Sequence, residues 1–178
     1  MLVVDDDASI RESVKKILQA EGYEVLLAAD GQEAVARYDP GRINLLLLDI
    51  ELPNCSGWDT FENFTTKNPW LAVIVITGHA EQYRVAAAAG VSAFMEKPID
   101  AAELLRTIQD LLAEPKEARI RRLIGRGSRP RYVPPDAHRV FHDLHARYST
   151  PFRWELPASA FPATSALRHR ENKHKIER

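Results

Sequence analysis

The sequence predicts an α/β fold in which a doubly wound sheet of five parallel strands alternates with five helices and is followed by a basic extension. Three observations lead to this fold class. Over the first 114 residues, short apolar runs alternate with longer segments whose apolar residues recur at helical spacing. The run from Ile43 to Leu48 is nearly all apolar without alternation, which is typical of a parallel strand covered on both faces. Composition and charge then change together near residue 114.

The expected strands are short apolar runs separated by the amphipathic segments. They span residues 2–4, 24–28, 43–48, 72–77 and 93–96. Strands that alternate with helices pair in parallel through right-handed crossovers, so we expect all five in one sheet. Ligands of such sheets bind beyond the carboxyl ends of the strands, near the point where the strand order reverses.

The expected helices carry an apolar stripe or a start signal. They span residues 9–20, 30–38, 58–67, 82–89 and 100–113. The last is the clearest, because its apolar residues from Leu104 to Leu112 fall on one side. Asp30, with Glu33 three residues later, is a weak match to a capping box at a helix start.

The distribution of charge divides the chain into two parts. Residues 1–114 hold 9 basic and 19 acidic residues, a net charge of −10, whereas residues 115–178 hold 15 and 6, a net charge of +9. Seven of the eleven prolines and five of the six histidines also follow Glu114. We therefore place a domain boundary near Glu114 and Pro115, with one buried domain before it and an extension after it.

Several classes of protein are excluded by composition. Cys55 is the only cysteine, so an internal disulfide framework and a zinc site of several thiolates are ruled out, and Cys55 itself is interpreted as a bystander. No apolar run approaches the roughly 20 residues that span a bilayer. Asp5, Asp6 and Asp7 interrupt the place where a signal peptide would have its apolar core. We expect a soluble, cytoplasmic protein with no membrane partner.

Polar side chains follow the ends of four expected strands. Asp5 and Asp6 follow the first, Asp49 ends the third, Thr77 ends the fourth and Lys97 follows the fifth. These ends converge on one edge of a parallel sheet. Three adjacent carboxylates repel one another and need a cation, and oxygen ligands suit a hard ion such as Mg²⁺. A carboxylate left free to attack, with a lysine and a hydroxyl nearby, is suited to accepting a phosphoryl group.

Four short motifs stand at these strand ends, at residues 4–7, 48–57, 75–80 and 94–98. In this order they resemble the motifs of the response-regulator receiver domains of bacterial two-component signalling, and the resemblance covers about residues 1–114. Each motif lies at a strand end, and four in the right order would rarely coincide by chance. The resemblance implies a flavodoxin-like sheet with the strand order 2-1-3-4-5.

The resemblance also implies roles at the acidic residues. Asp49 is then the phosphoacceptor, and Asp6 and Asp49 bind Mg²⁺ together with the backbone carbonyl of Glu51. Asp5 would act mainly through a water molecule on the metal. Glu51 and His79 occupy positions at which this family tunes dephosphorylation, and their effect in this chain is an open question.

Four further residues receive roles from the same resemblance. Lys97 would pair with the phosphoryl oxygens and Thr77 would donate a hydrogen bond to them. Phe94 would change rotamer as Thr77 moves, although an aromatic residue here can also be simple packing. Pro98 corresponds to a cis-proline that aims Lys97 into the site. Phosphorylation would then bias two arrangements of the face formed by helix four, strand five and helix five.

The implied partners are a histidine kinase or phosphotransfer protein and an unknown downstream protein, with a phosphorylation-dependent dimer left open. The chemistry would take place on the protein itself, as phosphorylation and autodephosphorylation, so we do not expect a metabolic enzyme. Two alternatives remain. The chain could be a DNA-binding transcription regulator with an atypical or truncated output region, or a receiver fragment of a hybrid kinase.

The basic, proline-rich extension, residues 115–178, matches no recognised domain and is expected to be partly helical or disordered. Helix five is predicted to continue through Ile124, and a second helix to span Asp136 to Tyr148. The extension could bind nucleic acid, fold back on the acidic domain as a brake or bind a partner, and we favour disorder or a partner segment. A metal site formed by three histidines on one side of the second helix is less favoured than a solvated face. These histidines are His138, His142 and His145.

Overall fold

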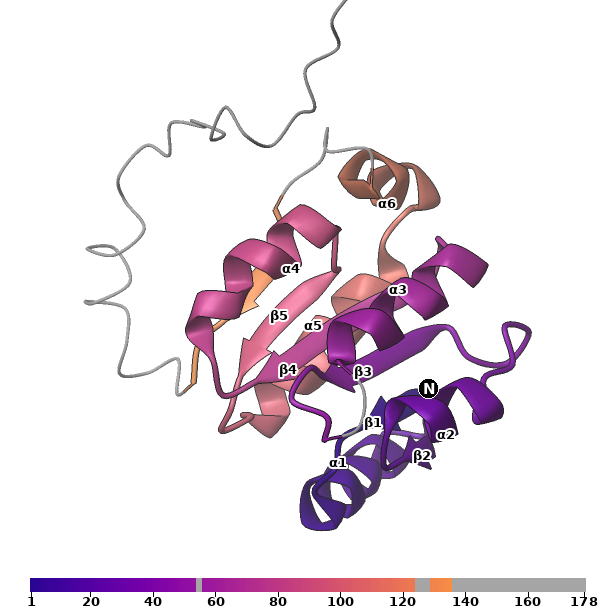
Figure 1. Ribbon diagram of the computed structural model, residues 1–178, viewed down its shortest axis with the longest axis vertical. Coiled ribbons are helices and arrows are strands. Elements are labelled where there is room, and N and C mark those ends of the chain that lie inside the picture. The colour runs from indigo at the N-terminus through magenta and orange to yellow at the C-terminus, as the bar shows by residue number, and fades with distance from the viewer. Residues whose placement is uncertain (54–55, 124–128, 136–178) are drawn as a thin grey trace, which may run out of the picture.

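The computed structural model describes residues 1–53, 56–123 and 129–135 as a parallel sheet with helices on both faces (Figure 1). Cys55, the predicted helix from Asp136 to Tyr148 and its three histidines lie outside the described residues. Within those residues, the structure contains no helix of the length and apolarity that crossing a membrane requires.

The sheet has six parallel strands in the order β2-β1-β3-β4-β5-β6. Their bounds are β1 (Leu2–Val4), β2 (Leu26–Ala28), β3 (Leu45–Asp49), β4 (Ala72–Thr77), β5 (Ala93–Glu96) and β6 (Arg131–Val133). The predicted order of the first five strands is confirmed, but the predicted number of strands is wrong. The sixth strand comes from the basic extension, where three residues between Pro130 and Pro134 carry no apolar run that would mark a strand.

Six α-helices and one short 3₁₀-helix are found in the described part of the chain, instead of the five helices predicted. They are α1 (Ala8–Ala20), α2 (Gly31–Arg37), α3 (Gly57–Lys67), η1 (Ala80–Gln82), α4 (Tyr83–Ala89), α5 (Ala101–Ala113) and α6 (Lys116–Leu123). The predicted continuation of helix five is wrong. Glu114 has extended backbone angles, φ −63° and ψ 126°, because the residue before a proline disfavours the helical region, and α6 begins after Pro115.

The helices form a layer on each face of the sheet. Helices α1 and α5 cover one face, while α2, α3 and α4 cover the other (Figure 1). Along β3, Leu45 and Leu47 join the core beneath α1 and α5, and Leu46 and Leu48 join the core on the opposite face. This placement explains the apolar run without alternation, because both faces of the strand are buried.

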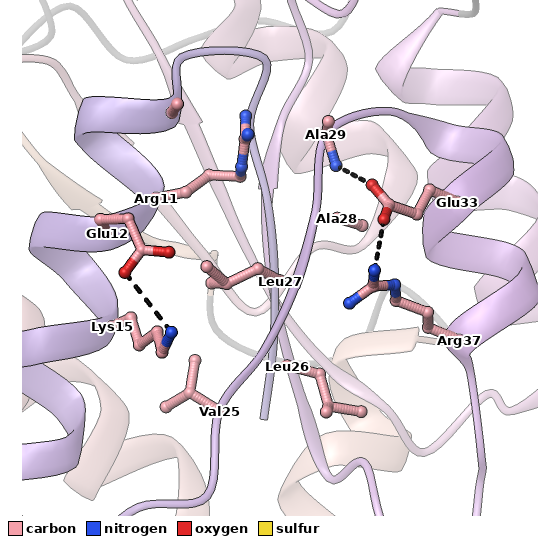
Figure 2. A pocket seen from close by; sticks show the side chains of 11 residues that line it. Arg11, Glu12, Lys15, Val25, Leu26, Leu27, Ala28, Ala29, Glu33 and Arg37 are labelled. Atoms are coloured by element: carbon pink, nitrogen blue, oxygen red, sulfur yellow. Dashed lines mark hydrogen bonds and ion pairs between the residues drawn. The ribbon is translucent and has the colours of Figure 1, made fainter.

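Short acidic and hydroxyl side chains fix where several helices begin. Asp7 accepts hydrogen bonds from the backbone N–H groups of Ser9 and Ile10 at 2.7 and 3.3 Å, and these bonds hold the pKa of Asp7 below its ordinary value. Asp30 accepts from the N–H of Glu33, whose carboxylate accepts in turn from the N–H of Ala29 at 2.6 Å (Figure 2). The reciprocal bond therefore reaches one residue beyond the capping box that the sequence predicts.

The start of α3 lies directly against the end of β3, and Gly57 makes this approach possible. A Cβ atom on Gly57 would lie 2.2 Å from the Cα of Ile50 and 2.7 Å from the carbonyl oxygen of Asp49. Its N–H also donates to the carbonyl of Ile50 at 3.3 Å. The glycine therefore sets the path of the chain immediately after Asp49.

We expect Gly57→Ala to lower the free energy of unfolding by about 1–3 kcal/mol, because the added methyl group overpacks rigid backbone. Urea denaturation followed by circular dichroism measures this change. Gly78→Ala is the matched control, since its Cβ would meet only the flexible end of Glu51, at 3.8 Å. Equal losses for the two variants would contradict the steric explanation.

Candidate functional site at the carboxyl edge of the sheet

Four strand ends place the predicted site residues at one edge of the sheet. Asp5 and Asp6 follow β1, Asp49 is the last residue of β3, Thr77 is the last residue of β4 and Lys97 follows β5. Because β1, β3, β4 and β5 are consecutive neighbours, their carboxyl ends lie side by side.

A lysine bridges two buried carboxylates at this edge. The Nζ of Lys97 lies 2.6 Å from Oδ2 of Asp49 and 3.0 Å from Oδ2 of Asp5. The side chains of Asp49 and Asp5 are only 2% and 5% exposed. Short charge-assisted contacts of this kind offset the cost of burying the two acids.

The local fold also holds the second oxygen of each acid. Oδ1 of Asp5 accepts from the N–H of Asp7 at 2.8 Å, and Oδ1 of Asp49 accepts from the N–H of Glu51 at 2.8 Å. Both carboxylates are therefore fixed in orientation by their own loops as well as by Lys97.

Burial and charge act in opposite directions on the pKa values here. Burial raises the pKa of Asp5, although the hydrogen bonds from Lys97 and Asp7 oppose this change. Burial alone would lower the pKa of Lys97, but its hydrogen bonds to Asp49 and Asp5 outweigh that effect and raise it. Lys97 is therefore fully protonated at neutral pH and supplies a fixed positive charge.

Three acids at the site form a set of oxygen ligands suited to a cation. Asp5, Asp6 and Asp49 each offer one carboxylate oxygen, and these oxygens lie within 4.8 Å of one another. Asp6 is exposed while the other two are buried, so the cluster opens to solvent on one side. Carboxylates grouped in this way fit a hard ion such as Mg²⁺, which keeps some of its water ligands. The role of the Glu51 carbonyl as a ligand stays a prediction.

The side chain of Glu51 belongs to the site in a way that the sequence did not predict. Its Oε1 accepts from the hydroxyl of Thr77 at 2.5 Å and from the N–H of Gly78 at 3.1 Å. Nε2 of His79 lies 3.5 Å from the same oxygen, and the N–H of His79 donates to Oγ1 of Thr77 at 3.1 Å. No signal in the sequence gives the direction of this side chain, because Glu51 lies in a loop without periodicity.

Phe94 and Pro98 are the two other residues to which the resemblance assigns roles. Phe94 is fully buried, with its ring 5.7 Å from that of Tyr83 in an edge contact and 5.9 Å from that of Tyr132 in a stacked one. The peptide bond between Lys97 and Pro98 is cis. Phe94 therefore packs with an aromatic residue of the basic extension, a contact for which the sequence carries no signal.

A hollow at the other side of the sheet contains none of the predicted site residues. It lies at the edge strand β2 between α1 and α2, and its charged lining includes the partly exposed pairs Lys15–Glu12 and Arg37–Glu33 (Figure 2). Exposed pairs of this kind contribute little energy, and the acidic cluster remains the better candidate site.

Comparison with curated proteins identifies relatives over about two-thirds of the chain. It is 33% identical over 114 residues to the probable transcriptional regulatory protein TcrX of Mycobacterium tuberculosis, a match that covers 63% of this chain and 49% of that protein. It is 35% identical over 118 residues to the response regulator MprA of Mycobacterium avium, covering 65% of this chain and 52% of that protein. The chain therefore spans about half the length of the curated relatives it matches.

Solved structures similar to this chain are also receiver domains and response regulators. The CheY-like receiver domain protein of Methanospirillum hungatei JF-1 is 37% identical with a TM-score of 0.61, covering 65% of this chain and 94% of that one. The response regulator TrrA of Thermotoga maritima, solved in complex with Mg²⁺ and BeF, is 32% identical with a TM-score of 0.57, covering 62% and 96%. The family model of the response regulator receiver domain matches residues 1–109 of the sequence. The fold, the strand-end residues and these matches together show that the chain belongs to the response regulator receiver domain family.

Proposed function

We propose that Asp49 accepts a phosphoryl group from a histidine kinase or phosphotransfer protein, and that this event changes the face formed by α4, β5 and α5 to control a protein partner. The observation that carries the proposal is the setting of Asp49. Its buried carboxylate is held by Lys97 and by the N–H of Glu51, next to two further acids. Membership of a two-component receiver family supports the histidine kinase as partner.

The transfer itself needs a nucleophile and compensation of charge. A carboxylate oxygen of Asp49 forms a bond to phosphorus while the bond from phosphorus to the donor atom breaks, and the leaving group keeps the electron pair. Lys97 is 2.6 Å from Asp49 and meets negative charge that develops on the phosphoryl oxygens. Asp6, Asp49 and the Glu51 carbonyl would hold Mg²⁺, with Asp5 acting indirectly. The bound ion would supply further positive charge for those oxygens.

The reaction modifies the protein's own carboxylate, so the proposed role is that of a phosphoacceptor and not of an enzyme with a separate substrate. A cytoplasmic location belongs to the same proposal.

The name of one relative, a probable transcriptional regulatory protein, favours a second candidate function in which the basic extension binds DNA. Mobility-shift assays of the full chain on duplex DNA test it, since phosphate contacts would make the affinity fall steeply with salt.

We expect Asp49→Asn to abolish labelling by acetyl phosphate in the presence of Mg²⁺, because the amide removes the nucleophilic oxygen. Intact-mass spectrometry measures the added phosphoryl group. Asp59→Asn, at the first turn of α3, is the control and should be labelled like the original protein. Undiminished labelling of the Asp49→Asn variant, with no shift to another residue, would remove Asp49 from this role.

We expect Mg²⁺ to raise the melting temperature of the protein, since a ligand that binds only the folded state stabilises it by about 2.7 kcal/mol at 100 times its dissociation constant. Asp6→Asn should weaken this effect by removing a carboxylate from the cluster. Asp7→Asn is the matched control, because Asp7 caps α1 and lies outside the cluster. A Mg²⁺ response that is equal in both variants would contradict the assignment of the site.

Glu51 is engaged with two donors that a phosphoryl group on Asp49 could use. The Thr77 hydroxyl and the Gly78 N–H both donate to its carboxylate. An incoming phosphoryl group must therefore compete with Glu51 for these donors, and it also meets the negative charge of that side chain.

We expect Glu51→Ala to speed phosphorylation of Asp49 by acetyl phosphate about fivefold, the factor that corresponds to about 1 kcal/mol for one competing hydrogen bond. The time course of intact mass gives the rate. Glu81→Ala is the matched control, because Glu81 lies in η1 and contacts His79 at 3.0 Å, on the side of that ring away from Glu51. A slower rate for the Glu51→Ala variant would show that Glu51 assists the reaction.

A further inference from the structure

The edge of the sheet beside β5 is occupied by a segment of the basic extension. Strand β6 pairs in parallel with β5, with Arg131 opposite Ala93, Tyr132 opposite Phe94 and Val133 opposite Met95. An unpaired β5 would present a row of backbone N–H and C=O groups at an open edge. β6 covers that edge with residues that lie beyond the part of the chain matched by the receiver family, residues 1–109.

The side chains of β6 contact both helices that flank β5. Arg131 donates to Glu103 at 2.5 Å and also forms an ion pair with Asp110, both on α5. Val133 is 5% exposed and joins the core between the sheet and α5. On the opposite face the ring of Tyr132 lies 5.1 Å from that of Tyr83 on α4. β6 therefore occupies the same face that the proposed function expects to change.

A direct path joins β6 to the acidic cluster. The hydroxyl of Tyr132 donates to the carboxylate of Glu96, and Glu96 directly precedes Lys97. The N–H of Lys97 donates to the carbonyl of Thr77 at 2.9 Å, and Thr77 lies opposite Glu96 in the sheet. The end of β5 that aims Lys97 at Asp49 is thus the end that holds Tyr132.

The attachment of β6 is small enough to be altered by events at the site. The strand has three residues, and Val133 is its one buried side chain. The remaining contacts include the Tyr132 ring, its hydroxyl bond to Glu96 and the partly exposed ion pairs of Arg131. Exposed ion pairs and a single short edge strand contribute little, so the docked arrangement has a modest free energy.

We propose that β6 is a displaceable occupant of the β5 edge whose release is linked to phosphorylation of Asp49, an inference that rests on the proposed function. A phosphoryl group on Asp49 changes the position of Lys97, and with it the orientation of Glu96 and its bond to Tyr132. Release of β6 opens the β5 edge to an extended segment of a partner protein, which would pair there as β6 does. Linkage is reciprocal, so a docked β6 must equally oppose phosphorylation.

Hydrogen exchange of the full chain tests the release. With Mg²⁺ and beryllofluoride, a phosphoryl mimic, we expect the amides of β6 to exchange at least about fivefold faster, the lower end of typical coupling between sites. The amides of β2, at the sheet edge opposite β6 and outside the acidic cluster, should keep their protection and serve as the internal reference. Unchanged or slower exchange in β6 would overturn the inference.

The Tyr132→Phe variant tests whether a weaker attachment of β6 speeds phosphorylation of Asp49. It removes the hydroxyl bond to Glu96 and keeps the ring that stacks on Phe94. We expect faster exchange of β6 and roughly two- to fivefold faster phosphorylation of Asp49 by acetyl phosphate. Tyr38→Phe is the matched control, because it removes a phenol that accepts from Asn68 at 3.0 Å on the α2 and α3 side of the protein. Equal behaviour of the two variants would overturn the proposed path.

The two proposals fail in different ways. If acetyl phosphate does not label Asp49 in the original protein, the proposed function fails. If Asp49 is labelled while β6 exchanges as before, only the link between β6 and the site is overturned. Intact mass and exchange can be measured on the same sample, which keeps these outcomes separate.

Discussion

The position of Lys97 between Asp49 and Asp5 is the interaction on which the arrangement of the site depends. These two acids come from β3 and β1 and are buried side by side, where they would repel each other without a cation. Lys97 follows the carboxyl end of β5, so its contacts cross β4 to reach them. One ion-paired group therefore holds the carboxyl ends of non-adjacent strands together and connects Asp49 directly to the end of β5.

Glu51 sets a second constraint beside the first. Its carboxylate satisfies the hydroxyl of Thr77 and the N–H of Gly78, while its own N–H fixes Asp49. The loop after β3 thus orients the Asp49 carboxylate through the N–H of Glu51 and engages neighbouring donors through the Glu51 side chain. Under the proposed function these two effects act in opposite directions on phosphoryl transfer, because the first prepares Asp49 and the second keeps the donors occupied.

The sequence predicted most of the fold, and the reason is periodicity. The bounds of the first five strands and of helices α1 to α5 differ from the predicted ones by at most two residues. Parallel strands all end at the same edge of the sheet, and the strand order predicts which side chains meet there. These side chains are Asp5, Asp6, Asp49 and Lys97. β6 could not be found in this way, since three residues carry no period and their pairing depends on contacts with α4 and α5. The contacts of the Glu51 side chain could not be predicted for a related reason, because sequence spacing does not fix the direction of a side chain in a loop.

Opposite charge helps to hold β6 on the edge of the sheet. Residues 1–114 carry a net charge of −10, and Arg131 belongs to the part of the chain with a net charge of +9. Arg131 forms ion pairs with two acids of α5, so the attraction between the acidic domain and β6 includes specific contacts at the edge of the sheet. Residues 136–178 are covalently joined to this anchored strand. These residues follow β6 in the chain after Pro134 and Pro135, so they are joined to the edge of the sheet that the proposed release of β6 would change.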